Sequence, residues 1–210
     1  MAGIPQHPTF TSEPEPAWDV ALLFPSQGDW SEGDFLALDT NHLVELVDGS
    51  LEVLPMPTTT HQLIAAFLHH LLTQFVSAGK LGVVFFAPLP IKIRGKTMRE
   101  PDILFVARQH QPKSNDTFLA IADLVMEVVS PGAEARDRDY NQKRADYAAL
   151  GINEYWIVDP QIQRITILSL HGGQYRVDGE FEVTQSAVST LLHGFTVDVS
   201  AVFAAANVLN

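Results

Sequence analysis

The spacing of hydrophobic residues predicts two principal helices set among short strands. Between residues 61 and 78, Leu63, Phe67, Leu71 and Phe75 recur at every fourth position, as on the apolar face of a helix. A second helix is predicted after residue 132, ending at Gly151, and a short one over residues 31–38. Strands are predicted over residues 43–47, 51–54, 83–86, 90–93, 102–106, 124–129, 155–158, 164–170 and 175–177.

The order of these elements indicates an α/β or α+β fold, in which helices flank a mixed β-sheet and a hairpin lies near the N-terminus. The hairpin turns at Asp48-Gly49, a dipeptide that favours tight turns. Residues 1–25 are rich in proline and have little periodicity, so they are predicted to form a flexible arm. Residues 26–210 are predicted to form a single domain, because a chain of 210 residues is too short to expect two.

Composition narrows the class of protein. The chain contains no cysteine, which excludes disulfides, thiolate metal sites and a cysteine nucleophile. It shows neither a secretory signal nor an apolar run of about 20 residues, the length of a membrane span. We therefore expect a cytoplasmic protein. The net charge of -12 argues against a general nucleic-acid coat, but residues 80–144 hold eleven of the thirteen Lys and Arg and could form one basic face.

A single charge interrupts the most hydrophobic strand. Glu127 lies within residues 124–129, which are otherwise apolar on both faces, as in a central strand. An ionised carboxylate there costs several kcal/mol, by rough estimate, unless a lysine or a divalent metal accompanies it. Asp102 opens another apolar strand directly after Pro101. Taken alone, such an aspartate more often faces water or caps a turn.

Two further charged residues are predicted to point inward. On the helix that ends at Gly151, Lys143 shares the inward face with Tyr147, whereas Asp139 and Asp146 are predicted to lie away from it. The alternative is a lysine whose ammonium reaches back to water. Glu45 alternates onto the apolar face of the N-terminal hairpin, although an edge hairpin could equally expose that face.

Carboxylates and a lysine in one place suit metal-dependent phosphodiester chemistry. Two or three carboxylates can hold Mg²⁺, with Mn²⁺ as a possible substitute, because hard cations take oxygen ligands. Such a metal polarises a phosphodiester and lowers the pKa of its bound water. A lysine beside it can steady the attacking water or the charge that develops on the phosphate. Metal carboxylate sites serve many enzyme classes, so this pattern alone leaves the reaction open.

Three motifs in a fixed order carry a family resemblance: REPDILFV at residues 99–106, LVMEVVSP at 124–131 and GINEYWIVDP at 151–160, with Lys143 and Tyr147 between the last two. Residues 45–49 and His61 add an N-terminal pattern. Together they resemble the Uma-type family of putative restriction endonucleases, which belongs to the PD-(D/E)xK nuclease superfamily. The resemblance covers roughly residues 30–203 and implies a restriction-endonuclease-like fold.

The resemblance also implies roles for four residues. Asp102 and Glu127 match the metal-binding acids of the family, Lys143 its lysine, and Glu45 an N-terminal acid that completes the site. The superfamily pattern places the lysine two residues after the second acid, where this chain has Val129. The Uma-type family is similar to this chain in that its lysine comes from the following helix.

Four other residues are candidate substrate contacts. Arg136 and Arg138 flank the run into the predicted helix and could contact phosphate, with plain surface charge as an equal alternative. Arg99 belongs to a basic hairpin that could follow a nucleic-acid backbone or protect an edge strand. His61 follows a cap-rich segment and could reach the site, with ordinary packing as the alternative.

Two hypotheses of function emerge. The first is an Mg²⁺-dependent endonuclease that hydrolyses DNA, acting as a homodimer because cutting both strands needs two sites. The alternative is a catalytically inactive binding or assembly protein that keeps the nuclease fold, which the acidic net charge and the displaced lysine favour. Hydrolysis of a small phosphoester is also compatible with the sequence.

Overall fold

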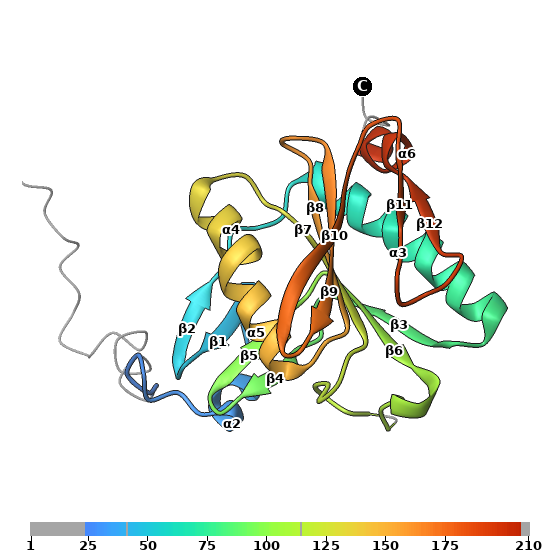
Figure 1. Ribbon diagram of the computed structural model, residues 1–210. Helices are drawn as coiled ribbons and strands as arrows, with labels where there is room; N and C mark the ends of the chain where they lie inside the picture. The colour runs from blue at the N-terminus through green and yellow to red at the C-terminus, as the bar shows by residue number, and fades with distance from the viewer. Residues whose placement is uncertain (1–23, 41, 114, 207–210) are drawn as a thin grey trace, which may run out of the picture.

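The computed structural model describes residues 24–40, 42–113 and 115–206 (Figure 1). All but two residues of the predicted arm lie outside these ranges. The elements are α2 (Glu32–Leu36), β1 (Val44–Val47), β2 (Ser50–Val53), α3 (Thr59–Gly79), β3 (Gly82–Phe86), β4 (Ile91–Arg94), β5 (Thr97–Arg99), β6 (Ile103–Ala107), β7 (Leu124–Val128), α4 (Ala133–Asp137), α5 (Lys143–Leu150), β8 (Glu154–Asp159), β9 (Arg164–His171), β10 (Gln174–Glu182), β11 (Ser186–Val188), β12 (Thr196–Asp198) and α6 (Val199–Ala204).

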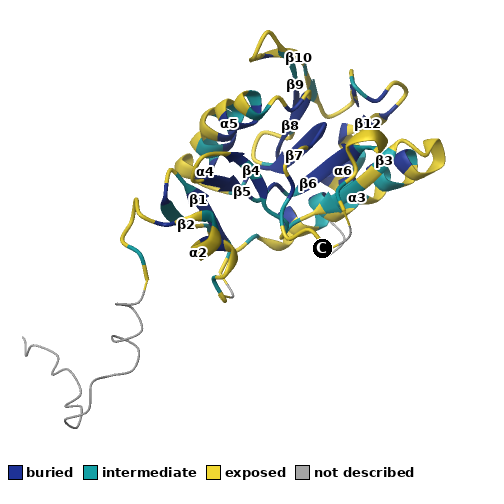
Figure 2. Ribbon diagram, turned by 90° about the horizontal axis from the view of Figure 1, so that it is seen from below, coloured by how far each residue is buried: buried dark blue, intermediate teal, exposed yellow. Residues whose placement is uncertain are grey.

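The larger sheet has six strands in the order β10-β9-β8-β7-β6-β3. Strands β7 and β8 pair in parallel, and the other neighbours pair antiparallel, so the sheet is mixed. Every residue of β7 and β8 is buried, which explains why both strands are hydrophobic on two faces (Figure 2). The predicted fold class, a mixed sheet flanked by helices with an N-terminal hairpin, is confirmed.

The N-terminal hairpin belongs to a second, four-stranded sheet with the order β2-β1-β5-β4. Leu46 of β1 pairs with Met98 of β5, and both side chains are fully buried with Trp30 and Phe35 in a small separate core. Short strands such as β5 were not predicted, because three residues show no measurable alternation. This small sheet lies beside α4 and α5 and forms one wall of the candidate site (Figure 1).

Helix α3 packs with α6 on one face of the large sheet. Its buried stripe runs from Ile64 to Val76, whereas the predicted stripe from Leu63 to Phe75 flanks it and is half-buried. The predicted stripe is therefore wrong by one position. Two adjacent rows of hydrophobic residues occur on this helix, and the curvature of the sheet, which the sequence does not reveal, decides which row is central. No helix in the described ranges is long and apolar enough to cross a membrane.

The predicted helix after residue 132 consists of α4, a π-helical turn over Arg138–Gln142, and α5. A π turn contains one extra residue, so it shifts the side chains before it relative to those after it. Asp139 and Asp146 were predicted to lie away from the inward face, and this is wrong, since both are buried. Asp139 stands four residues before Lys143, and its Oδ1 lies 4.0 Å from the Lys143 Nζ on the inward face. Helix α5 is covered by β4 as well as by the large sheet, and this second cover encloses Asp146.

Candidate functional site

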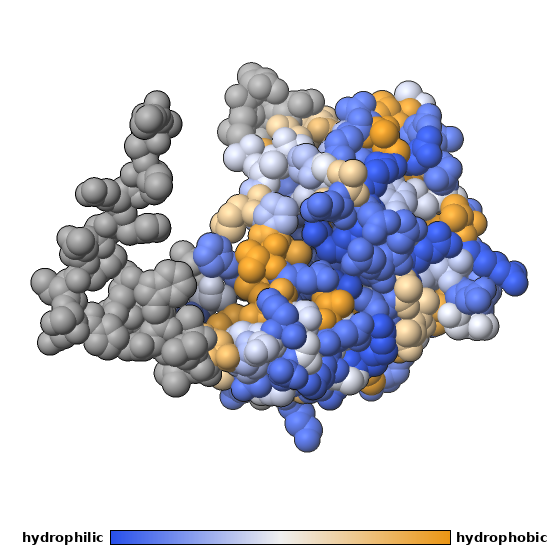
Figure 3. Space-filling view, turned by 90° about the vertical axis from the view of Figure 1, so that its left-hand side faces the viewer, coloured by the Kyte–Doolittle hydropathy of each residue, from blue (hydrophilic) through white to orange (hydrophobic). Residues whose placement is uncertain are grey.

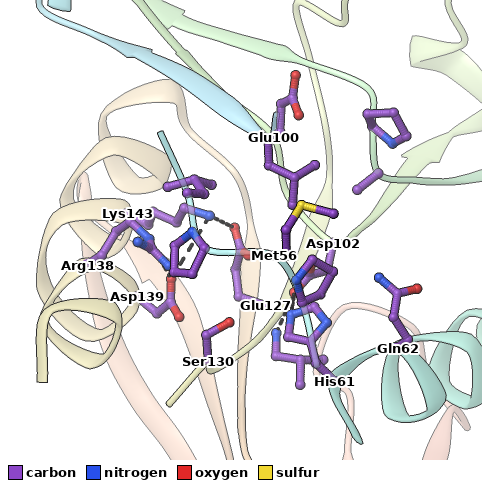
Figure 4. A pocket seen from close by; sticks show the side chains of 17 residues that line it. Met56, His61, Gln62, Glu100, Asp102, Glu127, Ser130, Arg138, Asp139 and Lys143 are labelled. Atoms are coloured by element: carbon purple, nitrogen blue, oxygen red, sulfur yellow. Dashed lines mark hydrogen bonds and ion pairs between the residues drawn. The ribbon is translucent and has the colours of Figure 1, made fainter. Parts of the chain in front are cut away.

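A pocket of about 270 Å³ opens where the small sheet, the start of α3, the end of β7 and the π-helical turn meet (Figure 4). Apolar side chains from the segment after β2, including Met56, form its outer rim. Its polar wall is formed by His61, Gln62, Glu100, Asp102, Glu127, Ser130, Arg138, Asp139 and Lys143. The pocket thus collects acids and bases from segments far apart in the sequence.

Asp102 stands directly before β6 and ties three elements together. Its Oδ2 accepts a hydrogen bond of 2.7 Å from the backbone N–H of Val128 and lies 3.1 Å from His61 Nε2. Burial lowers the pKa of His61, but the hydrogen bond and charge of Asp102 outweigh burial and raise it above its ordinary value. The raised pKa favours the protonated form of His61 beside Asp102, and His61 lines the pocket, as the sequence suggested.

Glu127 is 3% exposed and lies on β7 at the floor of the pocket. Its Oε1 accepts hydrogen bonds from Lys143 Nζ at 2.8 Å and from the Tyr147 hydroxyl. Burial raises the pKa of Glu127 to about 8, against the opposing charge of Lys143. A second positive charge at this carboxylate would favour its ionised form, since one lysine does not fully offset its burial.

Lys143 begins α5 and is 2% exposed, so it does not snorkel to water. Its Nζ lies 2.8 Å from Glu127, 3.1 Å from Glu45 and 4.0 Å from Asp139. Burial lowers the pKa of Lys143, but the surrounding carboxylates raise it well above its ordinary range, so the ammonium stays charged. The inward face predicted for Lys143 and Tyr147 is what the structure shows.

Glu45 lies behind Lys143 and does not line the pocket. It is fully buried and accepts hydrogen bonds from Arg99 Nη1 at 2.8 Å and from the backbone N–H of Glu100 at 3.0 Å. Burial raises the pKa of Glu45, but the charges of Lys143 and Arg99 lower it by a larger amount, so the net shift is downward. Glu45 therefore holds the lysine in place from behind.

Arg99 differs from the substrate contact that the sequence suggested. Its side chain is 1% exposed and does not line the pocket, because Glu45 and Asp146 hold it from two sides. Asp146 also accepts a hydrogen bond from Arg94. The alternation of basic residues along β4 and β5 could not distinguish this buried arginine from its exposed neighbours. Arg99 thus connects the small sheet to α5 and cannot reach a phosphate in solvent.

Of the two arginines after Gly132, Arg138 lines the pocket and Arg136 does not. Arg136 pairs with Asp159 and lies 4.4 Å from the centre of the Tyr140 ring, outside the pocket wall. Arg138 lines the pocket, its side chain is 15% exposed, and its Nε has no hydrogen-bond partner. Of the two predicted phosphate contacts, Arg138 is the one placed to meet a bound anion.

The sequence reasoning missed two acids of the pocket wall. Burial raises the pKa of Asp139 to about 6 and that of Glu100 to about 7. Asp139 stands four residues before Lys143, and this spacing alone could have paired them on one helical face. Glu100 follows Arg99 and precedes Pro101 in the REPD motif, but nothing in the sequence showed that its side chain is enclosed.

The pocket's donor set fits a divalent cation bound by two carboxylates. Within the described ranges, no three His, Asp or Glu side chains converge closely enough to hold a metal by themselves. Asp102 Oδ1 and Glu127 Oε2 make no hydrogen bond to the described residues, and both side chains line the pocket. Mg²⁺ binds proteins through one or two carboxylates and keeps several waters, so two free carboxylate oxygens are sufficient.

Comparisons with known proteins identify the family and the fold. The sequence pattern of the Uma2 family, described as "Putative restriction endonuclease", matches residues 33–200. A crystal structure described as a putative nuclease of DUF820 from Anabaena variabilis superposes with a TM-score of 0.69 at 19% identity, covering 87% of this chain and 99% of that one. This likeness shows the fold. No curated protein matches the chain.

A weaker likeness joins the chain to the type IIG restriction endonuclease BpuSI. The TM-score is 0.38 at 13% identity, and the match covers 72% of this chain and 16% of that one. A score at this level carries no argument about fold or function.

Proposed function

The chain belongs to the Uma2 family of putative restriction endonucleases, and on that premise we propose that it is an Mg²⁺-dependent endonuclease that hydrolyses phosphodiester bonds in DNA. The observation that carries the proposal is the meeting of Asp102, Glu127 and Lys143 in one pocket, with a free carboxylate oxygen on each acid. Family membership supports a nuclease, and the metal and DNA are our inference from the donor set.

Each residue has a separate task in this proposal. Asp102 and Glu127 would hold the cation, which when bound polarises the phosphodiester and acidifies a water. His61 fixes the orientation of Asp102, because it pairs with Oδ2 and leaves Oδ1 without a hydrogen bond to the described residues. Tyr147 and Lys143 fix Glu127 in the same way through Oε1.

Two cations in the wall would meet the substrate. The Lys143 ammonium lies at the floor beside Glu127 and stabilises negative charge that develops on the phosphate. Arg138 lines the pocket with its side chain 15% exposed, and its guanidinium can bind a non-bridging phosphate oxygen.

The test combines metal binding with cleavage. Calorimetric titration of Mg²⁺ should show binding by the wild type and none by Glu127→Gln, which keeps the size of the side chain and removes its charge. Cutting of supercoiled plasmid in Mg²⁺ should fall by at least about 100-fold in the same variant, the scale of one lost electrostatic group in an active site. Glu134→Gln, at an exposed glutamate of α4, is the matched control and should change neither readout.

One observation favours the second candidate, a catalytically inactive nuclease-fold protein. Lys143 is fully engaged by carboxylates, and the pocket wall carries more acids than cations. That candidate predicts neither Mg²⁺ binding nor cleavage by the folded wild type. Cutting by Glu127→Gln at the wild-type rate would refute the assignment of the site itself. The homodimer stays a prediction, which sedimentation analysis would test.

A further inference from the structure

A second hollow of about 310 Å³ adjoins the candidate site. It shares four lining residues with the pocket, namely His61, Gln62, Ala87 and Asp102. Its remaining walls are Ala65, Ala66 and His69 of α3 and Phe86 of β3. The two hollows therefore form one continuous depression that passes over Asp102, and the second hollow has the volume of sites that hold small organic groups.

Phe86 is the unusual residue of this hollow. It ends β3, the edge strand of the large sheet, and it is 61% exposed although it is a large aromatic. The His69 ring meets it edge-on, with ring centres 4.8 Å apart and planes at 67°. Burial lowers the pKa of His69, which favours its neutral imidazole, and His69 Nε2 also lies 3.4 Å from the Thr73 hydroxyl. The edge-on ring contact fixes the orientation of the Phe86 ring and leaves much of its surface open.

Gln62 supplies a polar group between the two hollows. Its side chain is exposed and makes no hydrogen bond to the described residues. In the close view it stands beyond His61, on the side away from Lys143 (Figure 4). A free amide carries both donors and an acceptor, which match the hydrogen-bonding edges of nucleobases.

The small number of free cations near the hollow distinguishes a duplex substrate from a single-stranded one. Most Lys and Arg side chains near the small sheet and α5 are engaged by protein groups: Lys92 by Glu32, Arg94 by Asp146 and Arg136 by Asp159. Duplex DNA is bound largely through phosphate contacts from free cations, which are scarce around this depression. On the face that contains β2, a hydrophobic patch lies among mostly hydrophilic residues (Figure 3). Single strands can instead bind through bases stacked on aromatic rings.

We propose that the Phe86 hollow is a nucleobase site, where an unpaired base stacks on Phe86 and meets the Gln62 amide while the adjoining phosphate lies over Asp102. The substrate is then DNA with an unpaired segment rather than an intact duplex. This inference rests on the proposed function, because Asp102 gives the hollow its relation to the cleaved bond. It adds the form of the substrate, which the carboxylates do not specify.

The test measures binding by fluorescence anisotropy, in Ca²⁺, of three labelled ligands: oligothymidine, an abasic strand of the same length and a duplex. The wild type should bind oligothymidine more tightly than either of the others. Phe86→Ala should weaken oligothymidine binding by roughly 5- to 150-fold, which corresponds to about 1–3 kcal/mol of stacking. The same change should leave binding of the abasic strand unaltered, and Phe86→Trp should restore the wild-type preference.

Phe24→Ala is the matched control, since Phe24 is a half-exposed aromatic that stacks on Trp30 and lines neither hollow. It should leave all three affinities unchanged. Equal affinity of the wild type for abasic strand and oligothymidine, tighter binding of duplex, or no binding of oligothymidine would each overturn the proposal. Failure of the proposed function looks different: oligothymidine binding would still depend on Phe86, and Mg²⁺ would stimulate no cleavage.

Discussion

Two buried glutamates on neighbouring parallel strands have opposite surroundings. Glu127 on β7 is held through one oxygen only, by Lys143 and Tyr147, and it lines a pocket. Glu154 opens β8 and is fully buried. Its two oxygens accept hydrogen bonds from five donors, which are the indole N–H of Trp156, the hydroxyls of Ser189 and Thr190, and the backbone N–H groups of Thr190 and Leu191.

The difference shows that burial of a carboxylate does not by itself identify a functional site. The oxygens of Glu154 are occupied by neutral hydrogen-bond donors, which fasten the segment between β11 and β12 to the large sheet and leave no oxygen free for a ligand. Glu127 has a free oxygen, a raised pKa and access to a pocket. The number of unused oxygens therefore separates a structural acid from a candidate ligand better than burial does.

The largest expected effect follows from removing the structural acid. Glu154→Ala leaves five buried donors without their acceptor, and we expect the free energy of unfolding to fall by about 3–5 kcal/mol. Urea unfolding followed by circular dichroism measures it. Glu180→Ala, at an exposed glutamate of β10, should cost under about 0.5 kcal/mol. A loss below about 1 kcal/mol for Glu154→Ala would contradict the structural role.

A slightly smaller effect is expected at the site. Lys143→Met removes the cation that Glu45 and Glu127 share, while both acids stay buried. We expect the free energy of unfolding to fall by about 3 kcal/mol and cleavage to be lost. The double variant with Glu127→Gln removes one of those charges, so it should recover part of the stability and none of the activity. Equal stabilities of the single and double variants would contradict the coupling between these two residues.

A moderate effect concerns pH. Burial raises the pKa of Asp139 to about 6 from an ordinary value of 3.8, so the folded protein binds this proton more tightly than the unfolded chain does. The contribution of Asp139 to stability is therefore full below about pH 4 and is lost as the pH rises to about 6. Asp139→Asn should flatten this fall in unfolding experiments between those pH values. An unchanged slope would show that Asp139 stays ionised.

The smallest effect on stability is expected at the pocket rim. Arg138→Gln removes a guanidinium whose Nε makes no hydrogen bond and lies 3.7 Å from Asp139, so the free energy of unfolding should change by less than about 0.5 kcal/mol. Its DNA binding should weaken, and the slope of log affinity against log salt should decrease by about one. Arg136→Gln, in which the lost cation already pairs with Asp159, should keep the wild-type slope. The same slope in both variants would remove Arg138 from the phosphate site.

The sequence predicted the centre of the site because the relevant signals are local. One charge within an apolar strand identified Glu127, and helical spacing turned Lys143 toward it. Asp139 was misplaced although it stands four residues before Lys143, a spacing that pairs side chains on one helical face. Asp146 was misplaced because its burial depends on how β4 packs against α5, which is a long-range contact. Arg99 was misjudged because its burial depends on how the small sheet docks against α5, which is a long-range property.

The same limits apply to the fold. Hydrophobic runs located β7 and β8 well, since both are buried on two faces. They did not identify which of the two hydrophobic rows of α3 is buried, because that depends on the surface that the helix covers. Phe86 was predicted as an ordinary strand residue, and only its position on an edge strand leaves it open to solvent.

The position of Glu45 has a consequence for synthesis of the chain. The hairpin that carries this acid leaves the ribosome before Arg99 and well before Lys143, the two cations that neutralise it. A nascent chain is synthesised from its N-terminus at about 5–20 residues per second, so the hairpin waits for several seconds with an acid that it cannot yet bury. Its docking is therefore delayed until α5 has emerged, and no partly made chain carries a finished nuclease pocket.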